Sequence, residues 1–427
     1  MTSVYNSSIT TRLIDPIFEK SKFRSEYRLN PETLYLPNLR LLNAGIEASA
    51  STELNGLIGT YGCIKSIQLY DGNQLLDQVL EASILNGFRN FNTSNDSNCS
   101  VNRFIKGHNL GYVCVGNNQI DANDGSLEKD TIAVKTQSVM NNNENLAWIA
   151  LNQLLPFLQS SVTLPTNVFT HLRIVVNWKS ETELRDMVGK SSGARALDLS
   201  TYTNTVLVAD EMNASDSKNN LMNGYQGVAY RPIEHDSVEI PSIAPATDET
   251  QEQETNVMVK GFNGKQVNTL LMVNTPTNRN TWANSGTNTN SELYTNQGSV
   301  SQYKPQIQVR INGSNKLARN GLTGYNKRLA TLVDAYGEVN IVMNQNVPNL
   351  KETGNYVDEN EIPTGQLDYT GMRVDEYVNE MIIDYTRTGV SGNDNLNQAV
   401  RLNLFGEVNK QVVMRNDGRY NVVYSQM

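Results

Sequence analysis

The segments IQLYDGNQLL (Ile67–Leu76) and QVRINGSNKL (Gln308–Leu317) decide the fold, because each joins a short alternating run to a tight-turn signal. Apolar and polar residues alternate up to an Asp-Gly or Asn-Gly pair, and a leucine follows. Alternation with a period of two predicts a half-buried strand. An Asx-Gly pair tolerates the positive φ of a type I′ hairpin turn. The same combination recurs 241 residues later, so two parts of the chain are expected to be built alike.

A helical pattern follows each of these segments. After the first, four apolar residues fall at i, i+3, i+4 and i+8, and Asn86-Gly87 would end the helix: Leu76, Val79, Leu80 and Ile84. After Asn320-Gly321, the spacing predicts a second helix, with Asn326 as its N-cap and Gly337 just past its end. The apolar residues of this second helix are Leu329, Leu332, Val333 and Tyr336.

Strand-like runs fill much of the rest. HLRIVVNWKS (His171–Ser180) and EMIIDYTRTG (Glu380–Gly389) are β-branched and almost continuously apolar, as buried strands are. Each precedes another strand candidate, NTVLVADEM (Asn204–Met212) or KQVVMRNDGRYNVVY (Lys410–Tyr424). TLYLPNLRLLNAG (Thr33–Gly45) alternates around a proline that suits an edge or bulge. The offsets between halves vary, so the pattern favours two copies of one β-rich domain, with chance similarity as the alternative.

Length and composition agree with two all-β domains. A chain of 427 residues exceeds the usual size of one hydrophobic core. Turn-forming residues cluster at Met212–Gly224, which places the domains at 26–214 and 215–427, after a polar arm at 1–25 that is expected to lie outside the core. The acidic segment 246–255 and the Asn/Thr-rich segment 275–299 are expected to be surface loops.

Charge, cysteines and hydropathy restrict the function. The net charge of −9 and the absence of any Lys/Arg run longer than two residues disfavour a protein that grips nucleic-acid phosphates. Cys63, Cys99 and Cys114 are too few and too irregular for a disulfide framework or a zinc site. Neither a signal-peptide core nor an apolar run of membrane-spanning length is found, so we expect the protein to be made and used in the cytosol or nucleus.

The sequence shows no recognisable catalytic, cofactor-binding or metal-binding site. His108, His171 and His235 are scattered and lack the spacing of metal ligands. KGFNGKQ (Lys260–Gln266) is interpreted as a hairpin turn rather than a phosphate cradle, since strand-like runs flank it. The acidic loop lacks the spacing of a calcium site. No site residue and no cofactor are predicted, and a structural or binding protein is favoured over an enzyme.

Several strings, in order along both halves, resemble the double jelly-roll major capsid proteins of polinton-like viruses, virophages and related double-stranded DNA viruses. They are LYLPNLRLLNAG (Leu34–Gly45), IKSIQLYDGNQLLDQV (Ile64–Val79), LPFLQSSVTLPTNVFTHLRIVVNW (Leu155–Trp178), YRPIEHDSVEIP (Tyr230–Pro241), GFNGKQVNTLLMVNTPT (Gly261–Thr277) and GSVSQYKPQIQVRINGSNKLARNGLTGYNKRLATLVDAYGEVN (Gly298–Asn340). The resemblance covers most of residues 14–424 and rests on these strings together, not on one diagnostic motif.

The resemblance implies two tandem eight-stranded antiparallel jelly rolls, each with a short helix near its beginning. It also implies a homotrimer that forms a pseudo-hexagonal capsomer of an icosahedral virion shell. Neighbouring capsomers and minor capsid or penton proteins would be its partners. The segment 275–299 and the loop around Asn92–Asn102 would face the exterior or the trimer contact, and the arm 1–25 would lie beneath, near an internal membrane.

Three other functions are alternatives to the capsid interpretation. A two-domain cupin enzyme would need clustered histidines and a glutamate as metal ligands, which the sequence lacks. A carbohydrate-binding surface or spike protein could use the same sandwiches, with Trp282 stacking on a sugar. A minor capsid or vertex protein would be expected to have a single jelly roll, so the duplication argues against it.

Overall fold

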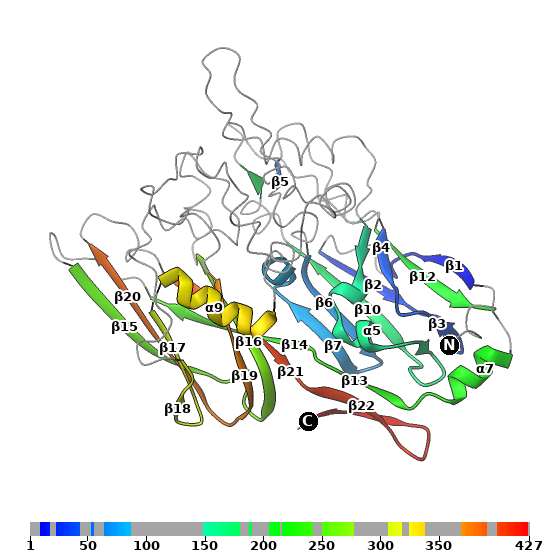
Figure 1. Ribbon diagram of the computed structural model, residues 1–427. Coiled ribbons are helices and arrows are strands. Elements are labelled where there is room, and N and C mark those ends of the chain that lie inside the picture. Colours follow the sequence, from blue (N-terminus) through cyan, green and yellow to red (C-terminus); the bar gives the residue numbers. More distant parts are fainter. Residues whose placement is uncertain are drawn as a thin grey trace, which may run out of the picture.

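The computed structural model describes a set of β-strands and a few helices (Figure 1). The described residues are 9–17, 23–42, 53–54, 64–86, 148–179, 188–189, 205–213, 216–241, 250–276, 306–317, 324–337, 369–390 and 399–425. Cys63, Cys99, Cys114, His108, Trp282 and the predicted loop at 92–102 lie outside these residues. Of the predicted loop at 275–299, residues 275 and 276 are instead the end of a strand, and the rest lies outside the described residues.

The first half of the chain forms two antiparallel sheets that pack face to face. One sheet has the order β2 (Arg24–Arg28), β10 (Leu172–Trp178), β6 (Ile64–Asp71), β7 (Gln74–Leu80). The other centres on β12 (Val206–Met212), which pairs with β1 (Ile9–Ile14), β3 (Leu34–Tyr35) and β4 (Arg40–Leu42). Outside these lie β9 (Leu164–Pro165) on β3 and β8 (Trp148–Ala150) on β4; a separate pair joins β5 (Glu53–Leu54) to β11 (Val188–Gly189).

The second half repeats this arrangement with longer strands. One sheet has the order β15 (Thr250–Val259), β20 (Met381–Val390), β17 (Gln306–Ile311), β18 (Ser314–Asn315). The other has the order β14 (Ile233–Ile240), β21 (Val400–Val408), β16 (Lys265–Pro276), β19 (Tyr369–Val378).

The two halves have the same topology, strand for strand. Counting β3 with β4 and β8 with β9 as interrupted strands, each half has eight strand positions in the same chain order. Successive positions lie in different sheets, except for the fourth and fifth (β6 and β7, β17 and β18), which form a hairpin within one sheet. This is the strand order of a jelly roll. The predicted fold of two eight-stranded jelly rolls is therefore confirmed. The repeated segments of the sequence are equivalent strands, since β6 and β17 take the same place and β10 and β20 pair with them.

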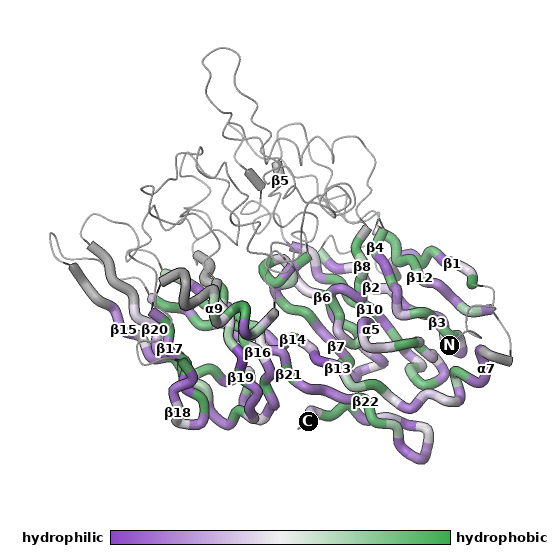
Figure 2. The backbone as a smooth tube through the Cα atoms, viewed as in Figure 1, coloured by the Kyte–Doolittle hydropathy of each residue, from purple (hydrophilic) through white to green (hydrophobic). Residues whose placement is uncertain are grey.

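Alternation explains the cores. In β6 the side chains of Ile64, Ile67 and Leu69 are fully buried, and β10 is buried along most of its length, as predicted. Green and purple segments alternate along many strands in Figure 2, because one face of each sheet meets the core and the other does not. One hydrophobic cluster is confined to the second jelly roll, and another fills the first and extends into the junction between the two.

The prediction of a helix from Leu76 to Ile84 was wrong. Residues 74–80 are strand β7, which pairs with β6, and only residues 82–86 of this region are helical. The register passes from Leu69↔Asp77 to Tyr70↔Leu75, so Leu76 is the extra residue of a β-bulge. The bulge leaves Leu76 and Val79 buried three residues apart, and this spacing imitates a helix.

The second predicted helix is confirmed as α9 (Gly324–Tyr336). It begins before Asn326, which lies inside the helix, so the predicted N-cap was wrong. Gly337 does follow the last helical residue, with φ of 77° and its N–H bonded to the Val333 carbonyl at 2.8 Å. α9 lies close against β19 because Gly371 has no side chain where a Cβ would lie 2.7 Å from Leu332 Cδ1.

The two hairpin turns differ in type. Asn312 and Gly313 both have positive φ, as a type I′ turn requires. In the first hairpin the two loop residues are Gly72 and Asn73, and of these only Gly72 has positive φ, which matches type II′ and not the predicted type I′.

Two further expectations need correction. Lys260–Gln266 forms a turn, but β15 and β16 on either side belong to different sheets, so it is a crossing between sheets and not a hairpin. Residues 250–255 of the expected acidic loop lie in β15, because backbone pairing with β20 tolerates polar side chains on an edge strand.

The predicted arm at residues 1–25 is not wholly outside the fold. Residues 9–14 form β1, which pairs with β12 over six residues from Ile9↔Met212 to Ile14↔Leu207. β2 begins at Arg24 and is also part of a sheet. The segment lacks an apolar pattern because β1 is an edge strand whose side chains are mostly exposed.

The remaining elements connect the strands of the two jelly rolls or pack against them. η3 (Leu151–Gln153) and α5 (Pro156–Ser160) belong to the first half, and α7 (Asp216–Asn223) precedes β13 (Gly227–Tyr230) between the halves. The predicted strand at 410–424 is a hairpin of β22 (Lys410–Met414) and β23 (Tyr420–Tyr424) that pairs with β13. The end of the chain therefore returns to the segment that joins the two jelly rolls.

Candidate functional site at the junction of the two jelly rolls

The junction is formed by strands from different edges of the two jelly rolls. In the first jelly roll, β7 is the edge strand of the sheet β2–β10–β6–β7. It lies beside β14, the edge strand of the sheet β14–β21–β16–β19 in the second jelly roll (Figure 1). These two strands are not equivalent in the jelly-roll topology. β13 and the hairpin β22–β23 close this contact. Side chains from both jelly rolls enter one hydrophobic cluster, and the second contributes Ile233, Leu271, Val273, Leu332 and Phe405. The two jelly rolls are thus joined by continuous apolar packing.

Aromatic rings extend the cluster across the junction. The ring of Phe157 in α5 makes edge-to-face contacts with two other rings. Its centroid lies 5.3 Å from that of Tyr230 in β13 and 5.8 Å from that of Phe169. Phe169 in turn meets Tyr420 of β23 at 5.0 Å. Edge-to-face pairs of this kind fix orientation as well as burying area. They hold the C-terminal hairpin in a defined position against the first jelly roll.

The bulge in β7 supplies the polar contact. Because Leu76 is outside the ladder, its carbonyl accepts a hydrogen bond from Lys410 Nζ at 3.2 Å and another from the Tyr230 hydroxyl. Tyr230 and Lys410 are buried, so both donors would be costly to leave unpaired. One bulged residue therefore ties β7 to both β13 and β22.

A second polar group lies on the side of the second jelly roll. Glu234 of β14 accepts a hydrogen bond from the Tyr424 hydroxyl at 2.8 Å and lies 3.8 Å from Lys265 Nζ. The ammonium groups of Lys265 and Lys410 lie 5.1 and 5.4 Å from the centre of the Tyr424 ring. Burial, the neighbouring Glu234 carboxylate and its hydrogen bond raise the pKa of Tyr424, so it stays a neutral donor.

Asp77 is the most perturbed carboxyl group at the junction. Its side chain is buried, and burial raises its pKa from 3.8 to about 7. Its two oxygens accept the backbone N–H groups of Gln78 at 2.8 Å and Phe157 at 2.7 Å, so it caps the start of α5. Burial likewise lowers the pKa of Lys410. Both Asp77 oxygens are occupied by the backbone, which gives the group a structural role and leaves no free oxygen for a substrate.

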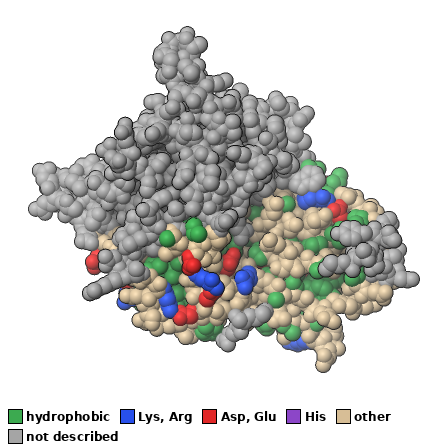
Figure 3. All heavy atoms as spheres, viewed as in Figure 1, with side chains coloured by type: hydrophobic (Ala, Val, Ile, Leu, Met, Phe, Trp, Pro, Cys, Tyr) green, Lys and Arg blue, Asp and Glu red, His purple; other side chains and the backbone are tan. Residues whose placement is uncertain are grey.

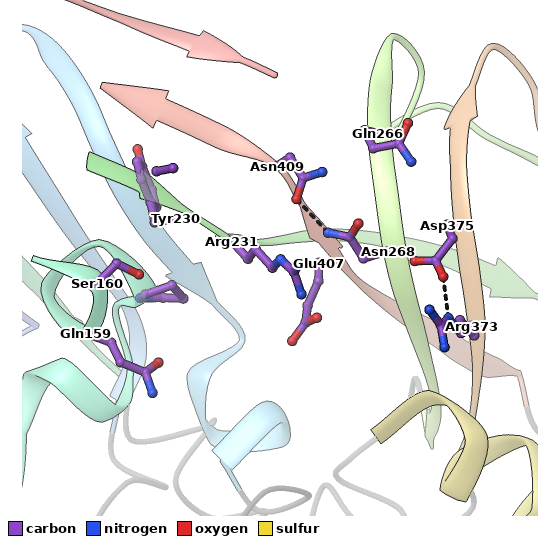
Figure 4. Close-up of a pocket in the computed structure, with 12 residues that line it drawn as sticks. Gln159, Ser160, Tyr230, Arg231, Gln266, Asn268, Arg373, Asp375, Glu407 and Asn409 are labelled. Atoms are coloured by element: carbon purple, nitrogen blue, oxygen red, sulfur yellow. Dashed lines mark hydrogen bonds and ion pairs between the residues drawn. The ribbon is translucent and has the colours of Figure 1, made fainter. Parts of the chain in front are cut away.

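A polar cleft of about 790 Å³ opens between α5 and the second jelly roll (Figure 4). Gln159 and Ser160 lie on one side of it, and Asn268 and Glu407 on the other. The full lining is Pro156, Gln159, Ser160, Ala229, Tyr230, Arg231, Gln266, Asn268, Arg373, Asp375, Glu407 and Asn409. The lining offers hydroxyl, amide, carboxylate and guanidinium groups, all of which can take part in hydrogen bonds.

The ends of this cleft are held by local contacts. Asn268 is the extra residue of a bulge in β16, and its Nδ2 donates to Asn409 Oδ1 at 2.8 Å. Arg373 is paired with Asp375, which has a positive φ of 49°. The side chains are engaged with one another, and we assign the cleft no chemistry.

His171 and His235, the two histidines among the described residues, do not meet at a site. His235 lies in β14 with Nε2 3.2 Å from Asn403 Oδ1, its ring packs on Phe405, and burial lowers its pKa. His171 is exposed at the start of β10. Within the described residues no three His, Cys, Asp or Glu side chains are placed to hold a metal ion. Over the same residues, no helix is long and apolar enough to cross a membrane.

No site residue is predicted from the sequence, and the polar groups at the junction are not among its candidates. Asp77 could have been noticed as a single carboxylate in the otherwise uncharged run QLLDQVL, and Lys410 as a charge at the start of a strand. On the surface, acidic and basic side chains are interspersed over the second jelly roll on the face shown in Figure 3, without a large patch of one sign.

No protein-family model matches the chain, and no curated protein matches it in sequence. Solved structures do match over nearly the whole length. A chain of the Sputnik virophage cryo-EM structure matches with a TM-score of 0.55 at 8% identity, over 98% of this chain and 89% of that one. The mavirus major capsid protein matches with a TM-score of 0.50 at 8% identity, over 97% and 90%. The VP54 protein of PBCV-1, as fitted into a reconstruction of Sputnik, matches with a TM-score of 0.50 at 10% identity, over 98% and 97%. The chain has the double jelly-roll fold of these viral major capsid proteins.

Proposed function

We propose that the protein is the major capsid protein of a double-stranded DNA virus of the polinton-like or virophage kind, and that three copies form a pseudo-hexagonal capsomer. The observation that carries the proposal is the joining of two jelly rolls of identical topology by continuous packing. Two similar units per chain give a trimer six similar units around its axis, and such a ring can tile a shell.

The shared fold with the mavirus major capsid protein supports this proposal. We also propose that the chain has two functional units that meet between residues 214 and 215, after the end of β12 and before the start of α7. The first unit includes β1 and the whole of β2, so it begins before residue 26.

The partners and location follow from the same proposal. The capsomer would contact neighbouring capsomers and minor capsid or penton proteins in the virion shell, after assembly in the cytoplasm or nucleus of the host. The acidic net charge of −9 favours contacts with proteins over direct, sequence-specific contacts with nucleic acid. The N-terminal segment is the proposed contact with an internal membrane.

The test is the solution mass by light scattering, followed by negative-stain imaging. We expect three times the chain mass of 47.5 kDa and particles with a hexagonal outline. A protein that remains a monomer at capsid-like concentrations would contradict the proposal. The carbohydrate-binding alternative depends on Trp282, which lies outside the described residues, and it is not proposed.

A further inference from the structure

Equivalent edge strands of the two jelly rolls differ sharply in exposure. β14 lies beside β7, and the two strands that meet there are mostly buried or half-buried. β1 in the first jelly roll is equivalent to β14 in the second, and β18 in the second is equivalent to β7 in the first. Both β1 and β18 are almost wholly exposed. β1 and β18 lie on opposite sides of the molecule (Figure 1). Within one chain, β7 of the first jelly roll and β14 of the second therefore cover each other, whereas their equivalents β18 and β1 stay exposed.

The uncovered edge of the first jelly roll carries an apolar patch. Ile9 and Leu13 lie on the same face of β1 and are 46% and 65% exposed. Ile17 and Phe23, between β1 and β2, are 45% and 41% exposed. These are four of the ten large hydrophobic side chains that are exposed among the described residues, and all four lie within 15 residues of the sequence. Exposed apolar side chains on and next to an uncovered edge strand are suited to contact with another protein surface.

The charges on the two uncovered edges are complementary. Arg24 and Arg28 on β2 are exposed, and together with Arg173 they surround the single buried carboxylate of Glu26. Exposed Asp15, between Leu13 and Ile17, offsets part of this charge, and a small positive excess remains beside the apolar side chains. On the β18–β19 edge, Asp375, Glu376 and Glu380 outnumber the cations that pair with them, Arg373 and Lys316.

The contact inside the chain shows how these edges can be used. It joins unlike edges, so it is a head-to-tail contact, and repetition of such a contact closes a ring when the rotation allows. We propose that the β1–β2 edge, centred on Leu13, docks the β18–β19 edge of a second copy of this chain. This inference rests on the proposed function, because it names the surface through which the trimer would close.

The first experiment is light scattering of Leu13→Asp over a range of protein concentrations. Leu13 is exposed on an edge strand, so the variant should fold, with an unchanged circular dichroism spectrum. We expect the concentration at which half of the chains are assembled to rise at least about tenfold, because a charge would be buried in an apolar contact. The matched control is Met258→Asp, which is 53% exposed on β15, away from both uncovered edges, and should leave assembly unchanged.

The second experiment tests which surfaces meet. Chains carrying Leu13→Cys are mixed with chains carrying Ser314→Cys at the start of β18, and a short bismaleimide is added. We expect crosslinks between the two kinds of chain, and none beyond the wild-type background when either variant is treated alone. Crosslinks within the Leu13→Cys sample would instead indicate a like-with-like contact and would overturn the proposal.

The outcomes separate the inference from the proposed function. If the wild type is a trimer, but Leu13→Asp assembles normally and no mixed crosslink forms, the surface is wrong and the capsomer proposal stands. If the wild type is a monomer at every concentration, both are wrong.

Discussion

Replacing Asp77 with asparagine should remove a large dependence of stability on pH. Burial raises the pKa of Asp77 to about 7, from an ordinary value of 3.8. Between these values the folded chain keeps a proton that the unfolded chain has released. Folding then takes up a proton, so the free energy of unfolding falls as pH rises through this window. The separation of the two values corresponds to about 4 kcal/mol, complete above pH 7.

Urea unfolding of the wild type and Asp77→Asn from pH 4 to pH 8 measures this effect. Trp178 is buried in the same sheet as Asp77, so its fluorescence reports the transition that exposes the carboxyl group. We expect the wild type to lose about 4 kcal/mol relative to the variant between pH 4 and pH 8. Taking the difference at each pH cancels groups common to both proteins, such as His235.

Asp236→Asn is the matched control. Asp236 also accepts two backbone N–H groups, from Ser237 and Gly261 at 2.8 Å, but it is only partly buried. The Asp236→Asn variant measures how much the free energy of unfolding changes when a carboxylate acceptor is lost at a site that is not deeply buried. A difference between wild type and Asp77→Asn that stays constant within about 1 kcal/mol would refute the reasoning. If the wild type became relatively more stable as pH rose, the attraction of Lys410 would outweigh the cost of burial.

Three further substitutions test the packing. Gly406→Ala places a Cβ 2.5 Å from the buried ring of Phe262 and should lower the free energy of unfolding by about 1–3 kcal/mol, measured in urea. Asp210→Ala removes the carboxylate that pairs with Arg40 at 2.9 Å and accepts a hydrogen bond from the Thr11 hydroxyl of β1. It should lower the free energy of unfolding by about 3 kcal/mol in the same assay. Gly227→Ala combines a φ of 101° with a Cβ 2.1 Å from a backbone oxygen of β22, so it should detach the C-terminal hairpin; limited proteolysis that cleaves the variant no faster than wild type would contradict this.

The sequence predicted those parts of the fold that local pattern determines. β6 and β10 were found because their alternation or continuous burial is a property of neighbouring residues. β7 was missed because a bulge at Leu76 imposes a helix-like spacing on a strand. β1 was missed because its pairing with β12 joins residues about 200 positions apart and leaves no apolar alternation.

The junction was hidden for a similar reason. Asp77, Lys410 and Tyr230 come together only after both jelly rolls have folded, and none belongs to a motif of fixed spacing. The perturbed pKa of Asp77 arises from burial beneath elements distant in the chain, so no window of sequence contains its cause. Equivalence of the two halves, by contrast, was visible because their turn signals repeat.

The position of β22 and β23 has a consequence for biosynthesis. They follow every strand of both jelly rolls, so the ribosome makes them after all sixteen strand positions of the sandwiches. Nascent domains fold as units, N-terminal first, and each jelly roll can form before the hairpin exists. The Leu76 carbonyl and the Tyr230 hydroxyl would meet before Lys410 arrives, and the angle between the sandwiches would be fixed last. Chains cut short by premature termination would then fold but would lack the hairpin that fixes this angle, so the geometry of assembly would itself reject incomplete products.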